Sequence, residues 1–166
     1  MHIIENKEKV SVLFVCMGNI CRSPTAEGVF VRMVREAGLM ERIRIDSAGT
    51  HAYHIGNPPD PRSQQAALRR GYDLSPLRAR KVAPTDFSAF DYVLAMDEDN
   101  LSILRGLMPT EARAHVGLFM GFAPDYGVRE VPDPYYGGER GFEQVLDMVE
   151  AAATGLLDTI RRTHGW

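Results

Sequence analysis

The sequence predicts an α/β fold in which a parallel sheet is covered by helices on both faces. Apolar runs rich in β-branched residues alternate along the chain with segments whose apolar residues recur at helical spacing, as in repeated βα units. The chain has 166 residues, a length that fits one domain with a substantial core. In such a doubly wound fold, the functional site is expected at the carboxyl ends of the strands.

The first strand and helix are the clearest elements. Residues 10–15 form a nearly continuous apolar run, as in a strand that is buried on both faces. Ser23 is the expected N-cap of the following helix, with Pro24 at its first helical position. Apolar residues recur at helical spacing over residues 26–37, and Gly38 is suited to end this helix.

The later elements continue the alternation. Alternating apolar residues predict a second strand over residues 43–47, and a helix is expected over residues 62–70, ending at Gly71. Residues 92–96 read as a strand, with Asp97 just beyond its end. A long closing helix is marked by Phe142, Val145, Leu146, Val149, Ala152, Leu156 and Ile160.

Composition narrows the possible partners and compartments. Residues 1–8 are expected to be a flexible lead-in, and residues 9–166 a single domain, because no repeat or low-complexity linker divides them. With 22 acidic and 19 basic residues the net charge is −3, which argues against a nucleic-acid partner. No long apolar stretch, signal peptide or lipidation motif is found. We therefore expect a cytoplasmic protein with no membrane partner.

The segment between the first strand and its helix carries the chemistry. Cys16 and Arg22 lie six positions apart, and the loop between them can direct backbone N–H groups toward an anion at the helix N-terminus. The helix dipole and Arg22 favour the thiolate of Cys16, while the Arg22 guanidinium can grip two phosphoryl oxygens. The loop residues expected to bind the phosphate are Met17, Gly18, Asn19, Ile20 and Cys21.

Each of these residues also has a simpler interpretation. A lone cysteine is often a buried structural thiol, but here the strand, loop, arginine and helix start all favour a nucleophile. Gly18 and Asn19 are residue types that tolerate positive φ, as a tight loop requires. Ser23 is expected to hydrogen-bond the Cys16 thiolate in addition to capping the helix. The chain's two cysteines lack the further ligands of a structural zinc site, so no metal is expected.

At this motif the chain resembles the low-molecular-weight protein tyrosine phosphatases. The Cys-x5-Arg-Ser-Pro string with Gly-Asn inside it is specific to that family and its near relatives, and the resemblance extends from about Lys9 to the C-terminal helix. Three more blocks match in order: residues 46–49 with Tyr53 and 56–62, residues 96–101, and residues 131–136. The resemblance implies a four-stranded sheet and hydrolysis of tyrosine-phosphorylated proteins through a phosphocysteine intermediate. It implies inorganic phosphate as product and no cofactor.

The resemblance also assigns the acid and the walls of the cleft. Asp133, between two prolines, corresponds to the general acid, although an aspartate beside proline is also common in turns. Tyr53, Tyr135 and Tyr136 correspond to aromatic walls that enclose a phenyl ring together with Ile20. Exposed loop tyrosines are the commoner alternative. A deep slot favours phosphotyrosine because phosphoserine is too short to reach the loop.

One departure from the family concerns the support of the loop. Many members have a histidine in the segment of residues 77–80 that helps to hold the loop asparagine. In this chain the position is a leucine, Leu77, which cannot form that hydrogen bond. We expect Ser23 and Ser47 alone to support Asn19.

A second expectation concerns oxidation. Cys21 lies in the same loop as Cys16 and is expected to form a reversible disulfide with it. The alternative is that Cys21 is only a small packing residue.

Three other functions compete with tyrosine phosphatase. Arsenate reductases that use a thiol relay need further cysteines downstream, and none follows Cys21. A protein-arginine phosphatase is favoured by a polar residue in the position of Ile20, whose side chain cannot hydrogen-bond. An inactive phosphotyrosine-binding module requires loss of the nucleophile or acid, yet Cys16, Arg22 and Asp133 are all present.

Overall fold

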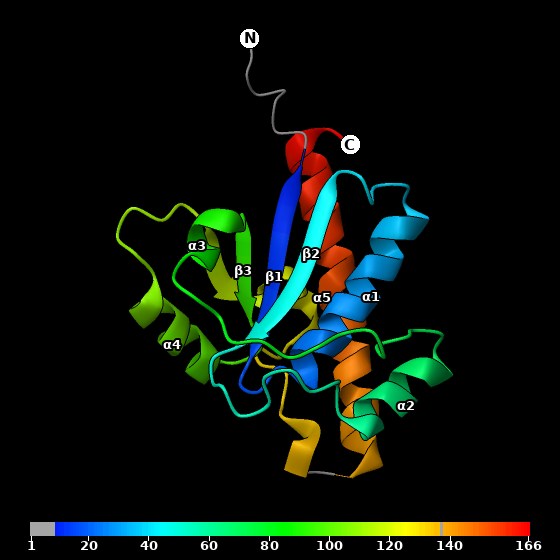
Figure 1. Ribbon diagram of the computed structural model, residues 1–166. Helices are drawn as coiled ribbons and strands as arrows, with labels where there is room; N and C mark the ends of the chain where they lie inside the picture. Colours follow the sequence, from blue (N-terminus) through cyan, green and yellow to red (C-terminus); the bar gives the residue numbers. More distant parts are fainter. Residues whose placement is uncertain (1–8, 137) are drawn as a thin grey trace.

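A four-stranded parallel sheet forms the centre of the structure, a computed structural model that describes residues 9–136 and 138–166 (Figure 1). The strands lie in the order β2-β1-β3-β4, and each neighbouring pair is parallel. Their bounds are β1 (Val10–Cys16), β2 (Ile43–Gly49), β3 (Tyr92–Ala95) and β4 (His115–Leu118). This confirms the predicted α/β fold and the four strands that the resemblance implied.

Helices cover both faces of the sheet, as Figure 1 shows. One face is covered by α1 (Arg22–Glu36) and α5 (Glu139–His164), and the other by α3 (Asp86–Ala89) and α4 (Glu98–Leu107). Because successive side chains of a strand point to opposite faces, Val12 and Phe14 join the apolar cluster of α1 and α5, whereas Leu13 and Val15 join that of α3 and α4. Strand β1 is therefore buried on both faces.

Shorter elements complete the chain and pack against α5. Helix α2 (Pro61–Arg69) contacts α5 near the carboxyl end of the sheet (Figure 1). Tight 3-10 turns follow β4: η2 (Phe119–Phe122), η3 (Pro124–Tyr126) and η4 (Pro134–Tyr136). The Phe14 ring contacts Phe119 of η2 edge-on at 4.9 Å between centroids. These contacts join β1, which leads into the Cys16 loop, to the closing helix.

Most of the predicted elements are confirmed with small shifts at their ends. Gly38 and Gly71 follow α1 and α2 with φ of 74° and 89°, the left-handed conformation that often ends a helix. The N-cap prediction for Ser23 was wrong, because α1 begins at Arg22 with Cys21 in the cap position and no side-chain cap bond. The Ser23 hydroxyl is instead used within the loop, as described below.

Three short elements, α3, α4 and β4, lacked a clear pattern in the sequence. Strand β4 is a short edge strand whose residues are exposed or only half-buried, so it has no continuous apolar run. Helix α4 is only ten residues long. The lead-in expected over residues 1–8 lies outside the described residues. Within the described part of the chain, no helix is long and apolar enough to cross a membrane.

Candidate active site

The predicted site residues meet in one cavity at the carboxyl ends of the strands. Its volume is about 150 Å³, and Cys16 lies at the end of β1 where the loop into α1 begins. The cavity is lined by Cys16, Met17, Gly18, Ile20, Cys21, Arg22, Tyr53, His54, Asp133 and Tyr135. The structure thus places together the expected nucleophile, the phosphate clamp, the acid and two of the three aromatic walls. The side chain of Tyr136 lies outside the described part of the chain.

The Cys16 thiol is buried and accepts hydrogen bonds from its own loop. The Asn19 N–H donates to Cys16 Sγ at 3.3 Å, and Ser23 Oγ lies 3.0 Å from the same sulfur. Asn19 Nδ2 donates to Ser23 Oγ at 2.8 Å. The Ser23 hydroxyl can donate its own hydrogen to this sulfur or to the Ala48 carbonyl oxygen, which lies farther away at 3.4 Å. Donors directed at a thiol stabilise its ionised form, so these bonds favour a thiolate nucleophile.

The rest of the loop keeps its backbone donors available. Across residues 9–136 and 138–166, no hydrogen bond within the chain occupies the backbone N–H of Met17, Gly18, Ile20 or Cys21. Helix α1 likewise starts without a side-chain cap. Buried N–H groups normally find an acceptor, and free donors beside a helix N-terminus are suited to an anion.

Asn19 is the residue that shapes the loop. Its φ of 60° is in the left-handed region, which asparagine tolerates better than most residues. Its Nδ2 donates to Ser23 and, at 3.0 Å, to Ser47 Oγ, as expected. The expectation that these serines act alone was wrong, because the Arg80 backbone N–H donates to Asn19 Oδ1 at 3.0 Å. The amide of Asn19 is thus held at both ends.

Two glycines allow the loop to lie close to its neighbours. Gly18 does not have the positive φ that its type suggested. Instead, it makes room for His54, whose Cδ2 lies 2.9 Å from where a Gly18 Cβ would be. A Cβ on Gly49 would lie 2.6 Å from the Met17 carbonyl oxygen. The loop backbone therefore packs directly on the end of β2.

Arg22 is buried among acidic groups. Its Nη1 donates to Asp97 Oδ2 at 2.6 Å and to the Val131 carbonyl at 3.0 Å, while Nη2 lies 3.7 Å from Asp133 Oδ2. Burial alone would lower the pKa of Arg22, but Cys16, Asp97 and Asp133 outweigh it and raise that pKa above its usual value. The guanidinium is therefore charged and oriented before any phosphate binds.

Asp133 is positioned by its own turn. Its Oδ1 accepts the Tyr135 N–H at 2.9 Å, and its side chain keeps 28 % of its surface exposed. The turn geometry and the acid role are therefore compatible, because the turn holds one oxygen while the carboxyl group still lines the cavity. Partial exposure allows exchange of a proton with water, as a general acid requires.

The aromatic walls are anchored outside the cavity. Tyr53 is 67 % exposed and stacks on His51 with centroids 5.1 Å apart. The Arg62 guanidinium lies 5.3 Å from the Tyr135 ring and bonds Asp60, the N-cap of α2. The Asp60 N–H in turn donates to the Ile20 carbonyl at 2.8 Å. This chain of contacts links the ring of Tyr135 to the loop between Cys16 and Arg22 (the phosphate loop).

Cys21 is buried beside the nucleophile and lines the same cavity. Burial raises its pKa to about 12, so Cys21 is a neutral thiol at physiological pH. Both cysteines are free in this structure.

Several residues at or near the site were missed by the sequence analysis. Asp97 had a signal, since an acidic residue directly follows a buried strand at its carboxyl end. His54 also lines the cavity, although a histidine in a loop gives no specific signal. Glu27 and Arg80 had no local signal, because both act through contacts distant in sequence. Within the described chain, no group of three or more histidine, cysteine or carboxylate side chains is placed to hold a metal.

Comparison with known proteins agrees with this geometry. The sequence profile of the low molecular weight phosphotyrosine protein phosphatases matches residues 11–165. A low molecular weight protein-tyrosine-phosphatase of Streptomyces coelicolor is 48 % identical over 153 residues, which cover 90 % of this chain and 93 % of that protein.

Two solved structures show the same fold. A protein tyrosine phosphatase from Entamoeba histolytica superposes with a TM-score of 0.90 at 39 % identity, covering 93 % of this chain and 99 % of that one. An arginine phosphatase from Drosophila superposes with a TM-score of 0.85 at 28 % identity, covering 90 % and 98 %. The chain belongs to the low molecular weight phosphotyrosine protein phosphatase family.

Proposed function

We propose that this protein hydrolyses phosphotyrosine in proteins through a phosphocysteine intermediate on Cys16. The observation that carries the proposal is the meeting of a hydrogen-bonded thiol, a buried charged arginine and a partly exposed aspartate in one cavity. The match to the family over nearly its whole length supports it.

In the first step the Cys16 sulfur attacks phosphorus as the bond to the tyrosyl oxygen breaks. Asp133, protonated at the start, gives its proton to the departing oxygen. Arg22 and the free loop N–H groups stabilise the charge on the other phosphoryl oxygens. Tyrosine leaves with that proton, and the phosphoryl group remains on sulfur.

In the second step water attacks the phosphocysteine. Asp133, now a carboxylate, accepts a proton from this water, the sulfur–phosphorus bond breaks, and inorganic phosphate is released. Cys16 returns as a thiolate, which its bonds to Asn19 N–H and Ser23 stabilise. The cycle needs only groups that line or adjoin the cavity.

The cavity walls favour a phenyl ring over a guanidinium. Ile20, Tyr53 and Tyr135 line the cavity beside the loop, and Ile20 offers no acceptor to the N–H groups of a phosphoarginine. A site that leaves substrate donors unpaired loses affinity for that substrate. Arginine phosphatase remains the alternative because a relative of the same fold has that activity.

The test is turnover of phosphotyrosyl, phosphoseryl and phosphoarginyl peptides side by side in the presence of EDTA. We expect hydrolysis of the phosphotyrosyl peptide alone, and Cys16→Ser should abolish it while phosphate binding and the fold persist. Arg22→Lys should also abolish hydrolysis, because the point charge of a lysine cannot replace the two parallel hydrogen bonds of the guanidinium to phosphate. Faster hydrolysis of phosphoarginine would overturn the substrate assignment, and an active Cys16→Ser variant would overturn the mechanism.

We further propose that residues 9–166 act as one phosphatase domain in the cytoplasm. Both apolar clusters are built on the same sheet, which supports one domain. The mechanism needs Cys16 reduced, and reducing compartments keep such thiols free.

A further inference from the structure

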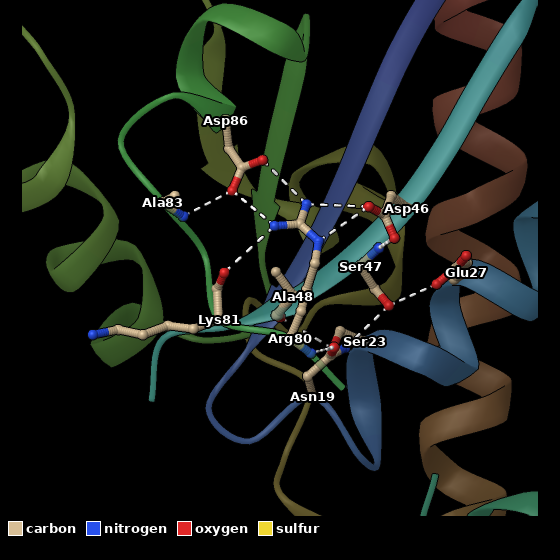
Figure 2. Close-up of polar contacts among 10 residues, drawn as sticks. All are labelled: Asn19, Ser23, Glu27, Asp46, Ser47, Ala48, Arg80, Lys81, Ala83 and Asp86. Atoms are coloured by element: carbon tan, nitrogen blue, oxygen red, sulfur yellow. Dashed lines mark hydrogen bonds and ion pairs between the residues drawn. The ribbon is translucent and has the colours of Figure 1, made fainter. Parts of the chain in front are cut away.

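We propose that Arg80 is a positioning residue for this reaction, acting on Cys16 through Asn19 from outside the cavity. The inference rests on the proposed phosphatase mechanism but concerns a residue that does not line the cavity. It is drawn from the way Arg80 joins the loop asparagine to two aspartates on different elements (Figure 2).

The backbone of Arg80 holds the phosphate loop directly. Its N–H donates to Asn19 Oδ1 at 3.0 Å, and its carbonyl accepts the Gly49 N–H at 2.8 Å. Val82 N–H then donates to the Gly49 carbonyl at 2.8 Å. The segment around Arg80 therefore lies along the end of β2, at the glycine on which the loop backbone packs.

The side chain of Arg80 fixes where that backbone lies. Its guanidinium donates to both oxygens of Asp86 at 3.0 and 3.1 Å and, through Nε, to Asp46 Oδ2 at 3.1 Å. Asp86 is mostly buried in α3 and also accepts the Ala83 N–H at 2.8 Å. A bidentate arginine pair defines orientation as well as distance, so Arg80 is fixed between α3 and β2 (Figure 2).

Asp46 connects the same arginine to a second support of Asn19. Its Oδ1 accepts the Ser47 N–H at 2.8 Å. The Ser47 hydroxyl donates to Glu27 at 2.6 Å, which leaves its lone pairs for Asn19 Nδ2. Arg80 thus controls both ends of the Asn19 amide, one through its own N–H and the other through Asp46 and Ser47.

Asn19 passes this constraint to the nucleophile. It donates its backbone N–H to Cys16 Sγ and its Nδ2 to Ser23 Oγ, which lies 3.0 Å from that sulfur. A loosened Asn19 would weaken both donors to the thiolate. Burial tends to lower the pKa of Arg80, but Asp86 and Asp46 outweigh it and raise that pKa, so the guanidinium remains charged across the working pH range.

Arg70 provides a matched control. It bonds Glu143, Asp147 and Glu150 at 2.8 to 2.9 Å and is 24 % exposed, against 35 % for Arg80. These bonds join the end of α2 to α5 and do not reach the phosphate loop. Loss of either arginine should cost stability, whereas only loss of Arg80 should alter the chemistry.

The experiment compares Arg80→Met with Arg70→Met. We expect Arg80→Met to lower kcat/KM about 3- to 30-fold, the range found for residues that act on a site through packed neighbours. It should weaken inhibition by inorganic phosphate and move the pH midpoint of Cys16 alkylation by iodoacetamide upward. Arg70→Met should change none of these three readouts, even where its Tm falls equally.

A double variant tests the route through Asn19. If Arg80 acts through Asn19, Arg80→Met should add little to the loss caused by Asn19→Ala. The inference would be overturned if the losses of kcat/KM in the two single variants multiplied in the double variant. It would also be overturned if phosphate inhibition and the pH midpoint of Cys16 alkylation were unchanged in Arg80→Met. Where Arg80→Met does not fold, Asp86→Asn removes one anchor and should give the same changes in smaller degree. Alkylation and phosphate binding do not need turnover, so they test Arg80 even if the substrate assignment fails.

Discussion

Arg22 has two acidic neighbours whose surroundings give them different roles. Asp97 lies 2.6 Å from Arg22 and uses its other oxygen to cap α4 through the Asn100 N–H. Asp133 is farther away, at 3.7 Å, and lines the cavity. A proton donor must reach the substrate and exchange with water. Asp133 meets these conditions, whereas Asp97 is occupied in orienting the guanidinium.

This division predicts how substitution of each aspartate changes the kinetics. Asp133→Asn should slow the hydrolysis of phosphotyrosine about 100-fold, because the departing tyrosyl oxygen needs a proton. The hydrolysis of p-nitrophenyl phosphate, which has a better leaving group, should be slowed much less. Asp97→Asn should weaken binding of phosphate for all substrates alike. The measurement is the slope of kcat against leaving-group pKa where phosphorylation limits turnover. An unchanged slope in Asp133→Asn would move the acid role to another residue.

We expect the outcome of Cys16 oxidation to depend on the second cysteine. Peroxide converts the Cys16 thiolate to a sulfenic acid with release of hydroxide. Attack by the Cys21 sulfur then forms a disulfide, and the sulfenic oxygen leaves as water with the Cys21 proton. Because burial raises the pKa of Cys21 to about 12, few Cys21 thiolates exist at neutral pH. We therefore expect the disulfide to form faster as pH rises from about 7 to 9.

Mass spectrometry of wild type and Cys21→Ser separates the outcomes. After mild peroxide, wild type should lose two hydrogens in mass and regain activity with dithiothreitol. Cys21→Ser should accumulate sulfinic acid and stay inactive. Equal recovery of both proteins would leave Cys21 with a packing role only.

At the scale of elements, close backbone approaches fix the loop and the closing helix. A Cβ on Gly49 would meet the Met17 carbonyl oxygen at 2.6 Å, and one on Gly155 would meet the Phe122 carbonyl oxygen at 1.8 Å. Neither neighbour is a flexible side chain, so the backbone must shift. The first contact is between β2 and the phosphate loop, and the second is between α5 and η2.

These two glycines give a prediction with an internal control. Gly49→Ala and Gly155→Ala should each destabilise the fold by about 1 to 3 kcal/mol, as over-packing does. Gly49→Ala should also reduce kcat/KM well beyond the effect of Gly155→Ala, because it displaces the loop that holds phosphate. Thermal unfolding and turnover of the folded fraction check this. Equal catalytic loss would show that Gly49 matters only for folding.

The elements near the site could be predicted from sequence where the signal is local. The strand, loop and helix around Cys16 follow one another along the chain, so their pattern was enough to predict that Cys16 and Arg22 meet at the end of β1. The contacts of Arg80 with Asn19 and of Glu27 with Ser47 span 61 and 20 positions, and no periodicity encodes them. Ser23 misled the cap prediction because its hydroxyl has better partners in the loop than at the helix end.

For the whole molecule, the buried carboxyl group of Glu27 links folding to pH. Burial raises its pKa from the ordinary 4.5 to about 7; Asp46 adds to this rise, while the Ser47 hydroxyl and Arg80 oppose it. Between these two pH values the folded protein binds more protons at this site than the unfolded chain does. The stability contributed by protonated Glu27 is therefore complete below about pH 4.5 and is lost as pH rises to about 7.

Replacing Glu27 by glutamine removes this titration while keeping a group that can hydrogen-bond Ser47. The free energy of unfolding of Glu27→Gln, relative to wild type, should rise between about pH 4.5 and 7 and then level off, by at most about 3 kcal/mol. Urea unfolding at several pH values measures the difference. Glu36→Gln, which changes an exposed glutamate on the same helix, is the control for the loss of one carboxyl group there. A difference for Glu27→Gln that stays flat with pH would mean that its carboxyl group is ionised in the folded protein, with Arg80 and the Ser47 hydroxyl offsetting the cost of burial.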